Sequence, residues 1–171
     1  LISKGHNPYS SLPKVLDPEH GYLFNTNNSP FNSAHPSDNL NEADFKDFQF
    51  DYMEDFNNRS NRFMKLMKDK NSLSMDDFFK IKYDIQYPDS IWTPSGANII
   101  FATKPADHPK YEQLLDLIHG WDKRGDTTSI GAAQWALYYS YFLSSGKEGR
   151  SQNQRMLTAL NSTQKHLKKH F

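Results

Sequence analysis

The stretch that decides the fold is residues 129–145, which read SIGAAQWALYYSYFLSS. Small residues at its start and large apolar residues after them predict a helix. The large side chains cover most of the circumference of that helix: Trp135, Tyr138, Tyr139, Tyr141, Phe142 and Leu143. A helix that is apolar on all sides is typically buried. We therefore expect residues 129–145 to form a buried helix in a mostly α-helical chain.

Other apolar residues recur at helical spacing on both sides of this stretch. A helix that ends near Gly120 is predicted by Leu114, Leu115, Leu117, Ile118 and Trp121, and a last helix by Met156, Leu160, Leu167 and Phe171. Upstream, Phe45, Phe48, Tyr52 and Phe56 step by three and four residues. Residues 99–102 (IIFA) are compatible with a short strand or a buried loop.

Two further signals mark helix boundaries between residues 57 and 90. Ser74 with Asp77 three residues later predicts a capping box, in which each residue hydrogen-bonds the other's backbone. The helix behind Ser74 should present Phe78, Ile81 and Ile85 on one face, and Tyr87-Pro88 should end it. We therefore expect residues 41–171 to be helical.

The first 40 residues have a different character. Ten of the 14 asparagines lie within the first 61 residues, and Asp17-Pro18-Glu19-His20-Gly21 is typical of a turn. Residues 21–25 (GYLFN) predict a short strand, which the polar run up to Pro30 should end. We therefore expect one fragment over residues 1–171, with a loop-rich part at 1–40 and one or two short β-strands.

Composition excludes several classes of function. Lys plus Arg and Asp plus Glu each number 20, so the formal net charge is zero. A zero net charge argues against a nucleic-acid-binding protein. Cysteine is absent, which excludes thiolate chemistry and disulfides, and no apolar run approaches the roughly 20 residues of a membrane span. Only 36% of residues are hydrophobic although 14% are aromatic. Either much of the chain is surface, or part of its core belongs to another chain.

Few residue constellations suggest chemistry. His166 and His170 share a helix face but lie beside three lysines, which is more typical of a solvated basic helix end than of a metal site. Tandem Asn27-Asn28 usually indicates a turn. A side-chain amide at a strand end could also donate to a developing oxyanion. Arg59 offers a fork of donors, although by itself it is typical of a surface arginine.

A family resemblance changes this balance. Residues 12–30 read LPKVLDPEHGYLFNTNNSP and resemble a motif of the penicillin acylase family. The downstream order is also similar over residues 5–143: a helix with Arg59 and Arg62, the helix start at Ser74, Asp84 within a helix, the Gly120-Trp121-Asp122 segment and the aromatic helix. The resemblance implies an N-terminal nucleophile hydrolase of αββα architecture, to which this helical chain would belong.

The same resemblance implies a reaction and partners. In this family the precursor cuts itself, and the new N-terminal serine attacks an amide carbonyl with its own α-amine as base. The chain begins with Leu1, so we expect a central piece of the large chain that is inactive alone. Its partners would be the small chain and the rest of the large chain. The substrate would be an N-acyl amide such as a penicillin, a cephalosporin side chain or an N-acyl homoserine lactone, and the location periplasmic.

Three residues of this sequence match functional positions of the family. The resemblance implies that Asn27 is the oxyanion-hole asparagine and that Arg59 supports it. It also implies that Asp38 is at the position of a calcium ligand, although calcium takes about six to eight oxygens and a solvated acid is an equally good interpretation. The alternative function is a non-enzymatic helical protein-binding module, whose contact surface would be the aromatic and acidic residues 38–56.

Overall fold

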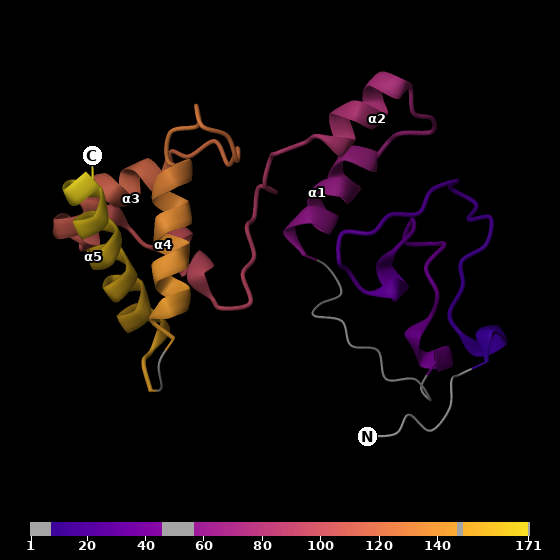
Figure 1. The fold of residues 1–171 in the computed structure, drawn as a ribbon, viewed down its shortest axis with the longest axis horizontal. Coiled ribbons are helices and arrows are strands. Elements are labelled where there is room, and N and C mark those ends of the chain that lie inside the picture. Colours follow the sequence, from indigo (N-terminus) through magenta and orange to yellow (C-terminus); the bar gives the residue numbers. More distant parts are fainter. Residues whose placement is uncertain (1–7, 46–56, 147–148, 171) are drawn as a thin grey trace. The chain divides into compact units, whose positions relative to one another are not determined.

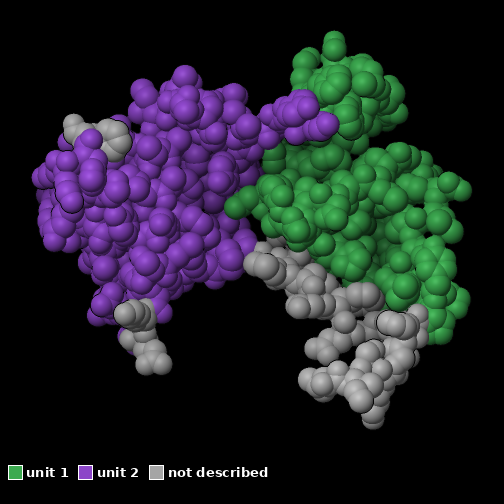
Figure 2. Space-filling view, in the orientation of Figure 1, with its two compact units in different colours: residues 1–81 green, residues 82–171 purple. Residues whose placement is uncertain are grey.

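The computed structural model describes residues 8–45, 57–146 and 149–170 of the chain. The chain divides into two compact units, Leu1–Ile81 and Lys82–Phe171 (Figure 1, Figure 2). The boundary predicted at residue 40, between a loop-rich part and a helical part, lies inside the first unit. The described residues are mostly helical, as predicted, whereas the αββα assembly stays a prediction.

The first unit combines short 3-10 turns with two helices, α1 (Asn58–Met67) and α2 (Met75–Lys82). The turns are Tyr9–Ser11, Pro30–Asn32 and Glu42–Phe45. The strand predicted at residues 21–25 is reduced to one isolated bridge, in which Leu23 pairs with Ala34. Its ends explain why: Gly21 has φ +70° and Asn27 has φ +61°, and both values turn the chain out of an extended conformation.

Both helices of the first unit begin with the caps that their sequences favour. Asn57 and Ser60 form a capping box at α1. At α2, the Asp77 N–H donates to Ser74 Oγ at 3.1 Å, and the Ser74 N–H donates to Asp77 Oδ2 at 3.2 Å. The predicted capping box at Ser74 is therefore confirmed.

The helix that follows Ser74 is shorter than predicted. It ends at Lys82, so Asp84 and Ile85 lie outside it. The backbone there pairs with another loop instead of continuing the helix. The Tyr87 N–H donates to the Lys123 carbonyl at 2.8 Å, and the Gly125 N–H donates to the Ile85 carbonyl at 3.0 Å. The helix predicted from Phe45 to Phe56 falls on residues 46–56, outside the described ranges, and Phe45 itself ends a 3-10 turn.

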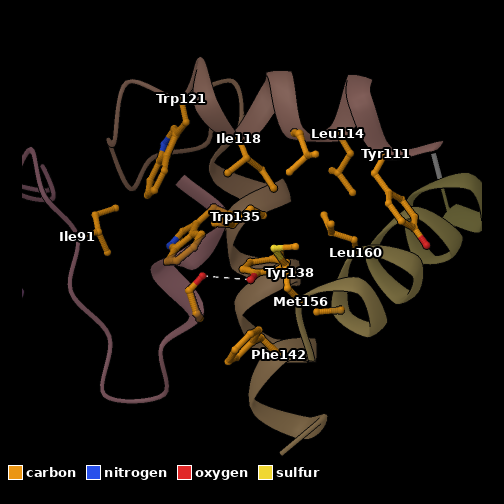
Figure 3. Close-up of a cluster of buried hydrophobic side chains, with 14 residues drawn as sticks. Ile91, Tyr111, Leu114, Ile118, Trp121, Trp135, Tyr138, Phe142, Met156 and Leu160 are labelled. Atoms are coloured by element: carbon orange, nitrogen blue, oxygen red, sulfur yellow. Dashed lines mark hydrogen bonds between the residues drawn. The ribbon is translucent and has the colours of Figure 1, made fainter. Parts of the chain in front are cut away.

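The second unit packs α3 (Glu112–His119), α4 (Ala132–Ser144) and α5 (Gln152–His170) around an aromatic core (Figure 3). Tyr138 and Phe142 from α4 are completely buried, and the core also receives Leu115 and Ile118 from α3 and Leu160 from α5. These helices match the predicted ones closely. The predicted burial of α4 on all sides is only partly right, because Leu143 is 49% exposed.

One core contact uses the segment whose structure the sequence left open. Residues 99–102 form neither a strand nor an irregular loop but part of a 3-10 helix, Ala97–Ala102. The Tyr138 hydroxyl donates to the Ala97 carbonyl at 3.1 Å, the dashed line in Figure 3. Burial raises the pKa of Tyr138 well above its usual range, so this hydroxyl stays a donor. In the described part of the chain, no helix is long and apolar enough to cross a membrane.

Candidate functional site

Asn27 is at the tip of a tight turn and has a left-handed backbone. Its φ is +61°, a region that asparagine visits more readily than most residues. The Asn27 N–H donates to Asn25 Oδ1 at 2.9 Å, which closes the turn. The Asn27 side chain is exposed. The sequence predictions of a turn and of a presented amide are therefore compatible: the turn is what presents the side chain.

Arg59, in the first turn of α1, contacts that side chain directly. Arg59 Nη2 donates to Asn27 Oδ1 at 2.6 Å. A guanidinium carries only donors, so the amide atom that faces it must be the oxygen. The amide group of Asn27 consequently points its NH₂ away from Arg59. Within the described residues this NH₂ has no acceptor, so it is available to a ligand.

Asn28 has a different environment from that of its neighbour. Its Oδ1 accepts from the Thr26 N–H at 2.8 Å and from the Thr26 hydroxyl at 2.7 Å. Its Nδ2 donates to the Asn32 carbonyl and, at 3.3 Å, to the Ser29 carbonyl. Asn28 is half-buried. It is a structural residue that holds the turn closed, whereas Asn27 is presented to the outside.

Asn57, the N-cap of α1, connects the turn to the helix. Its Oδ1 accepts from the backbone N–H groups of Arg59 and Ser60, each at 3.0 Å. Its Nδ2 donates to the Thr26 carbonyl at 2.7 Å. One side-chain amide therefore contacts the backbone on both sides of the Asn27–Arg59 pair.

Aromatic packing fixes the segment that precedes the turn. The Phe24 ring stacks on Phe63 of α1 with centroids 4.4 Å apart, and Tyr22 meets the same ring edge-on at 6.0 Å. Both rings are half-buried. Residues 22–28 thus rest on α1 through apolar contacts at one end and through Asn57 at the other.

Asp38 belongs to a separate cluster with two histidines. Its carboxylate accepts from the His20 backbone N–H at 3.0 Å and contacts His20 Nδ1 at 3.2 Å. The His20 ring stacks on His35 with centroids 3.5 Å apart and planes 10° apart. Hydrogen bonds from His20, the backbone N–H first among them, lower the pKa of Asp38. The Asp38 side chain is 7% exposed, and its partner His20 is 38% exposed.

The described neighbours of the Asp38 carboxylate include the imidazole groups of His20 and His35. Both carboxylate oxygens of Asp38 face His20, and the nearest rings are imidazoles and not the oxygen ligands that calcium prefers. In the described ranges, no group of three or more His, Cys, Asp or Glu residues could hold a metal. His166 Nδ1 pairs with the Tyr141 hydroxyl at 2.9 Å. We derive no chemistry from an ion here.

The comparison with known families can now be set beside this geometry. Residues 2–169 match the penicillin amidase family. The chain belongs to this family of hydrolases. Neither the search of curated proteins nor the search of solved structures gave a match. The family predicted from residues 12–30 is thus confirmed, whereas the roles of Asn27, Arg59 and Asp38 stay predictions.

The structure also separates what the sequence found from what it missed. Asn27 and Arg59, 32 residues apart, are brought into direct contact. Asn57 was missed, although its capping pattern with Ser60 is visible in the sequence. The surface of the alternative binding module, residues 38–56, falls mostly outside the described ranges, and membership of a hydrolase family favours the enzymatic interpretation.

Proposed function

We propose that this chain supplies the oxyanion-stabilising donor of an enzyme that hydrolyses N-acyl amides. The observation that carries the proposal is the 2.6 Å hydrogen bond from Arg59 Nη2 to Asn27 Oδ1. It fixes the amide so that the NH₂ of Asn27 points outward as a donor. Membership of the penicillin amidase family supports the reaction class.

The chemistry follows from where charge develops. When a nucleophile adds to an amide carbonyl, the carbonyl oxygen gains negative charge, and a fixed donor stabilises it more in the transition state than in the substrate. The loss of one such donor typically costs about 3 kcal/mol of transition-state stabilisation. Arg59 acts on Asn27 in two ways: it orients the amide, and its positive charge polarises the amide so that the NH₂ donates more strongly.

The nucleophile is expected elsewhere in the parent protein. We propose that it is an N-terminal serine whose own α-amine takes its proton, contributed by the remainder of the large chain. The small chain would complete the acyl pocket. The substrate class is penicillins, cephalosporin side chains or N-acyl homoserine lactones, and the enzyme would act in the periplasm. Turnover of an acyl anilide by residues 1–171 alone would contradict the proposal that the nucleophile lies in another part of the parent protein.

The test is the variant Asn27→Gly in the intact parent enzyme. Glycine accepts a positive φ without strain, so the turn is kept while the donor is removed. We expect kcat to fall about a hundredfold or more, with KM changed much less. The matched control is Asp69→Gly, because Asp69 is also exposed and has φ +65°. Equal and small changes in kcat for the two variants would mean that Asn27 is only a turn residue.

A further inference from the structure

We infer that Asn57 is a positioning residue for the reaction, because its side-chain amide holds the turn that carries Asn27 against the helix that carries Arg59. The inference rests on the proposed function. Three hydrogen bonds of the Asn57 side chain support the inference. Its Nδ2 donates to the Thr26 carbonyl at 2.7 Å, and its Oδ1 accepts from the N–H groups of Arg59 and Ser60 at 3.0 Å each. The Thr26 carbonyl belongs to the peptide bond that leads directly into Asn27.

Helix capping alone does not account for this arrangement. A cap needs only the oxygen of the side chain, and asparagine, aspartate and serine cap about equally well. At Asn57 the oxygen serves the cap, while the nitrogen bonds a carbonyl 31 residues earlier in the chain. Aspartate has no donor to offer that carbonyl, and the serine side chain is too short to span both contacts. Only the amide serves both segments in this geometry.

The geometry of the Asn27–Arg59 pair depends on the hydrogen bond from Asn57 to Thr26, because the other contacts of the pair are weak. The Asn27–Arg59 bond joins two exposed side chains, and an exposed pair by itself contributes little rigidity. The backbones beneath the pair must therefore fix its geometry. The Asn27 backbone is held by the bonds of Asn25, Asn28 and Asn57, and of these three only Asn57 connects it to α1. A displacement of about 1 Å of a catalytic group can cost a hundredfold in rate.

The test compares two N-caps in the parent enzyme. Asn57→Ser keeps an oxygen cap on α1 and removes the bond to Thr26. We expect a loss of tenfold or more in kcat, with KM nearly unchanged and a small change in melting temperature. Ser74→Ala, at the cap of α2, is the matched control, since it removes bonds to Asp77 and none to the Asn27 turn. It should lower the melting temperature and leave kcat unchanged. Asn57→Asp provides a second variant that keeps the cap.

A double-variant cycle separates this inference from the proposed function. If Asn57 acts through Asn27, then Asn57→Ser should cost little further kcat in the Asn27→Gly background. If Asn27→Gly lowers kcat but Asn57→Ser and Asn57→Asp do not, the positioning role is overturned while the oxyanion role stands. If Asn57→Ser lowers kcat equally in both backgrounds, its effect does not pass through Asn27, which also overturns the inference. If Asn27→Gly itself leaves kcat unchanged, the proposed function fails first.

Discussion

The fourteen side chains of the main buried cluster all lie in residues 82–171, whereas the turn that carries Asn27, in residues 1–81, is held by the side-chain amides of Asn25, Asn28 and Asn57. Among the described residues of the first unit, the buried apolar side chains are Phe31, Ala34 and Met67, and two serines are buried with them. Apolar burial stabilises without direction, while amide hydrogen bonds fix atoms in direction and distance.

This difference indicates how the two units divide their work. Aromatic packing on α4 can tolerate small shifts, because contacts between rings and aliphatic groups change gradually with distance. The Asn27 turn has no such tolerance, since a donor must meet its acceptor within a few tenths of an ångström. We therefore expect substitutions in the second unit to act on stability, and substitutions in the Asn27 turn to act on rate, with a loss of stability where they remove a bond that holds the turn.

The largest effect on stability is expected from Gly131→Ala in the second unit. Gly131 precedes α4 with φ +93°, and an added Cβ would lie 2.3 Å from the Leu117 carbonyl oxygen and 2.7 Å from Trp121 Cβ. Backbone strain and overpacking together should cost about 3 kcal/mol or more in the free energy of unfolding. Hydrogen exchange of peptides from α3 and α4 would measure it.

The control for Gly131→Ala is Gly149→Ala. Gly149 also has a positive φ, +83°, but no atom lies within 4 Å of an added Cβ. It should therefore cost only the backbone strain of about 1–2 kcal/mol. Equal protection losses for the two variants would mean that α3 and α4 are not packed as closely at Gly131 as the structure has them.

The next largest effect is expected from Asn28→Ala in the first unit. If residues 21–28 formed a strand, the Asn28 side chain would point away from that of Asn27, and its loss would be nearly neutral. In the structure it is half-buried and satisfies Thr26, Ser29 and Asn32. Its removal should cost about 2–3 kcal/mol, because backbone groups lose their partners, and kcat should fall as the turn loosens.

Leu23→Ala is the companion to Asn28→Ala. Leu23 lies on the same segment, 54% exposed, and pairs with Ala34 only through its backbone. Its truncation should change the free energy of unfolding by no more than about 0.5 kcal/mol. Denaturant unfolding measures the free energy of unfolding of the two variants, and assays of the folded variants measure kcat. A larger loss for Leu23→Ala than for Asn28→Ala would show that apolar burial, not amide bonding, holds this segment.

The smallest effect is expected from Asp126→Asn, on a surface loop of the second unit. Hydrogen bonds from Thr128 and then Arg124 lower the pKa of Asp126 to about 2. A lowered carboxylate pKa stabilises the folded state above the ordinary value of about 3.9, and this contribution is lost as pH falls toward 2. Thermal melts should therefore show a small loss for the variant at pH 7 that disappears near pH 2. A loss that grows on acidification would contradict the assignment.

The sequence predicted the second unit better than the first for a physical reason. Helices α3, α4 and α5 present apolar residues at helical spacing, and this periodicity is local information. The end of α2 was missed because Ile85 and Tyr87 pair with residues 123–125, a contact that no local pattern reveals. The 3-10 helix Ala97–Ala102 was left open for the same reason, since short apolar runs do not distinguish strand from buried helix.

The candidate site was predicted in its parts but not in its construction. The resemblance named Asn27 and Arg59, and the structure brings them together at 2.6 Å. The strand expected at residues 21–25 proved to be a single isolated bridge, and in the turn that follows it the side chains of Asn28 and Asn25 accept from the backbone N–H groups of Thr26 and Asn27. Asn57 could be recognised from sequence as an N-cap, but its bond to Thr26 depends on the tertiary fold.

The most direct test of the central claim is the steady-state kinetics of Asn27→Asp in the parent enzyme. Aspartate keeps the size of the side chain, tolerates a positive φ and still accepts from Arg59, while the outward NH₂ donor is replaced by an oxygen of a negatively charged carboxylate. We predict a fall in kcat of a hundredfold or more with an unchanged or raised melting temperature. A kcat within a few-fold of the native value, in a variant that melts normally, would contradict the claim that Asn27 donates to the oxyanion.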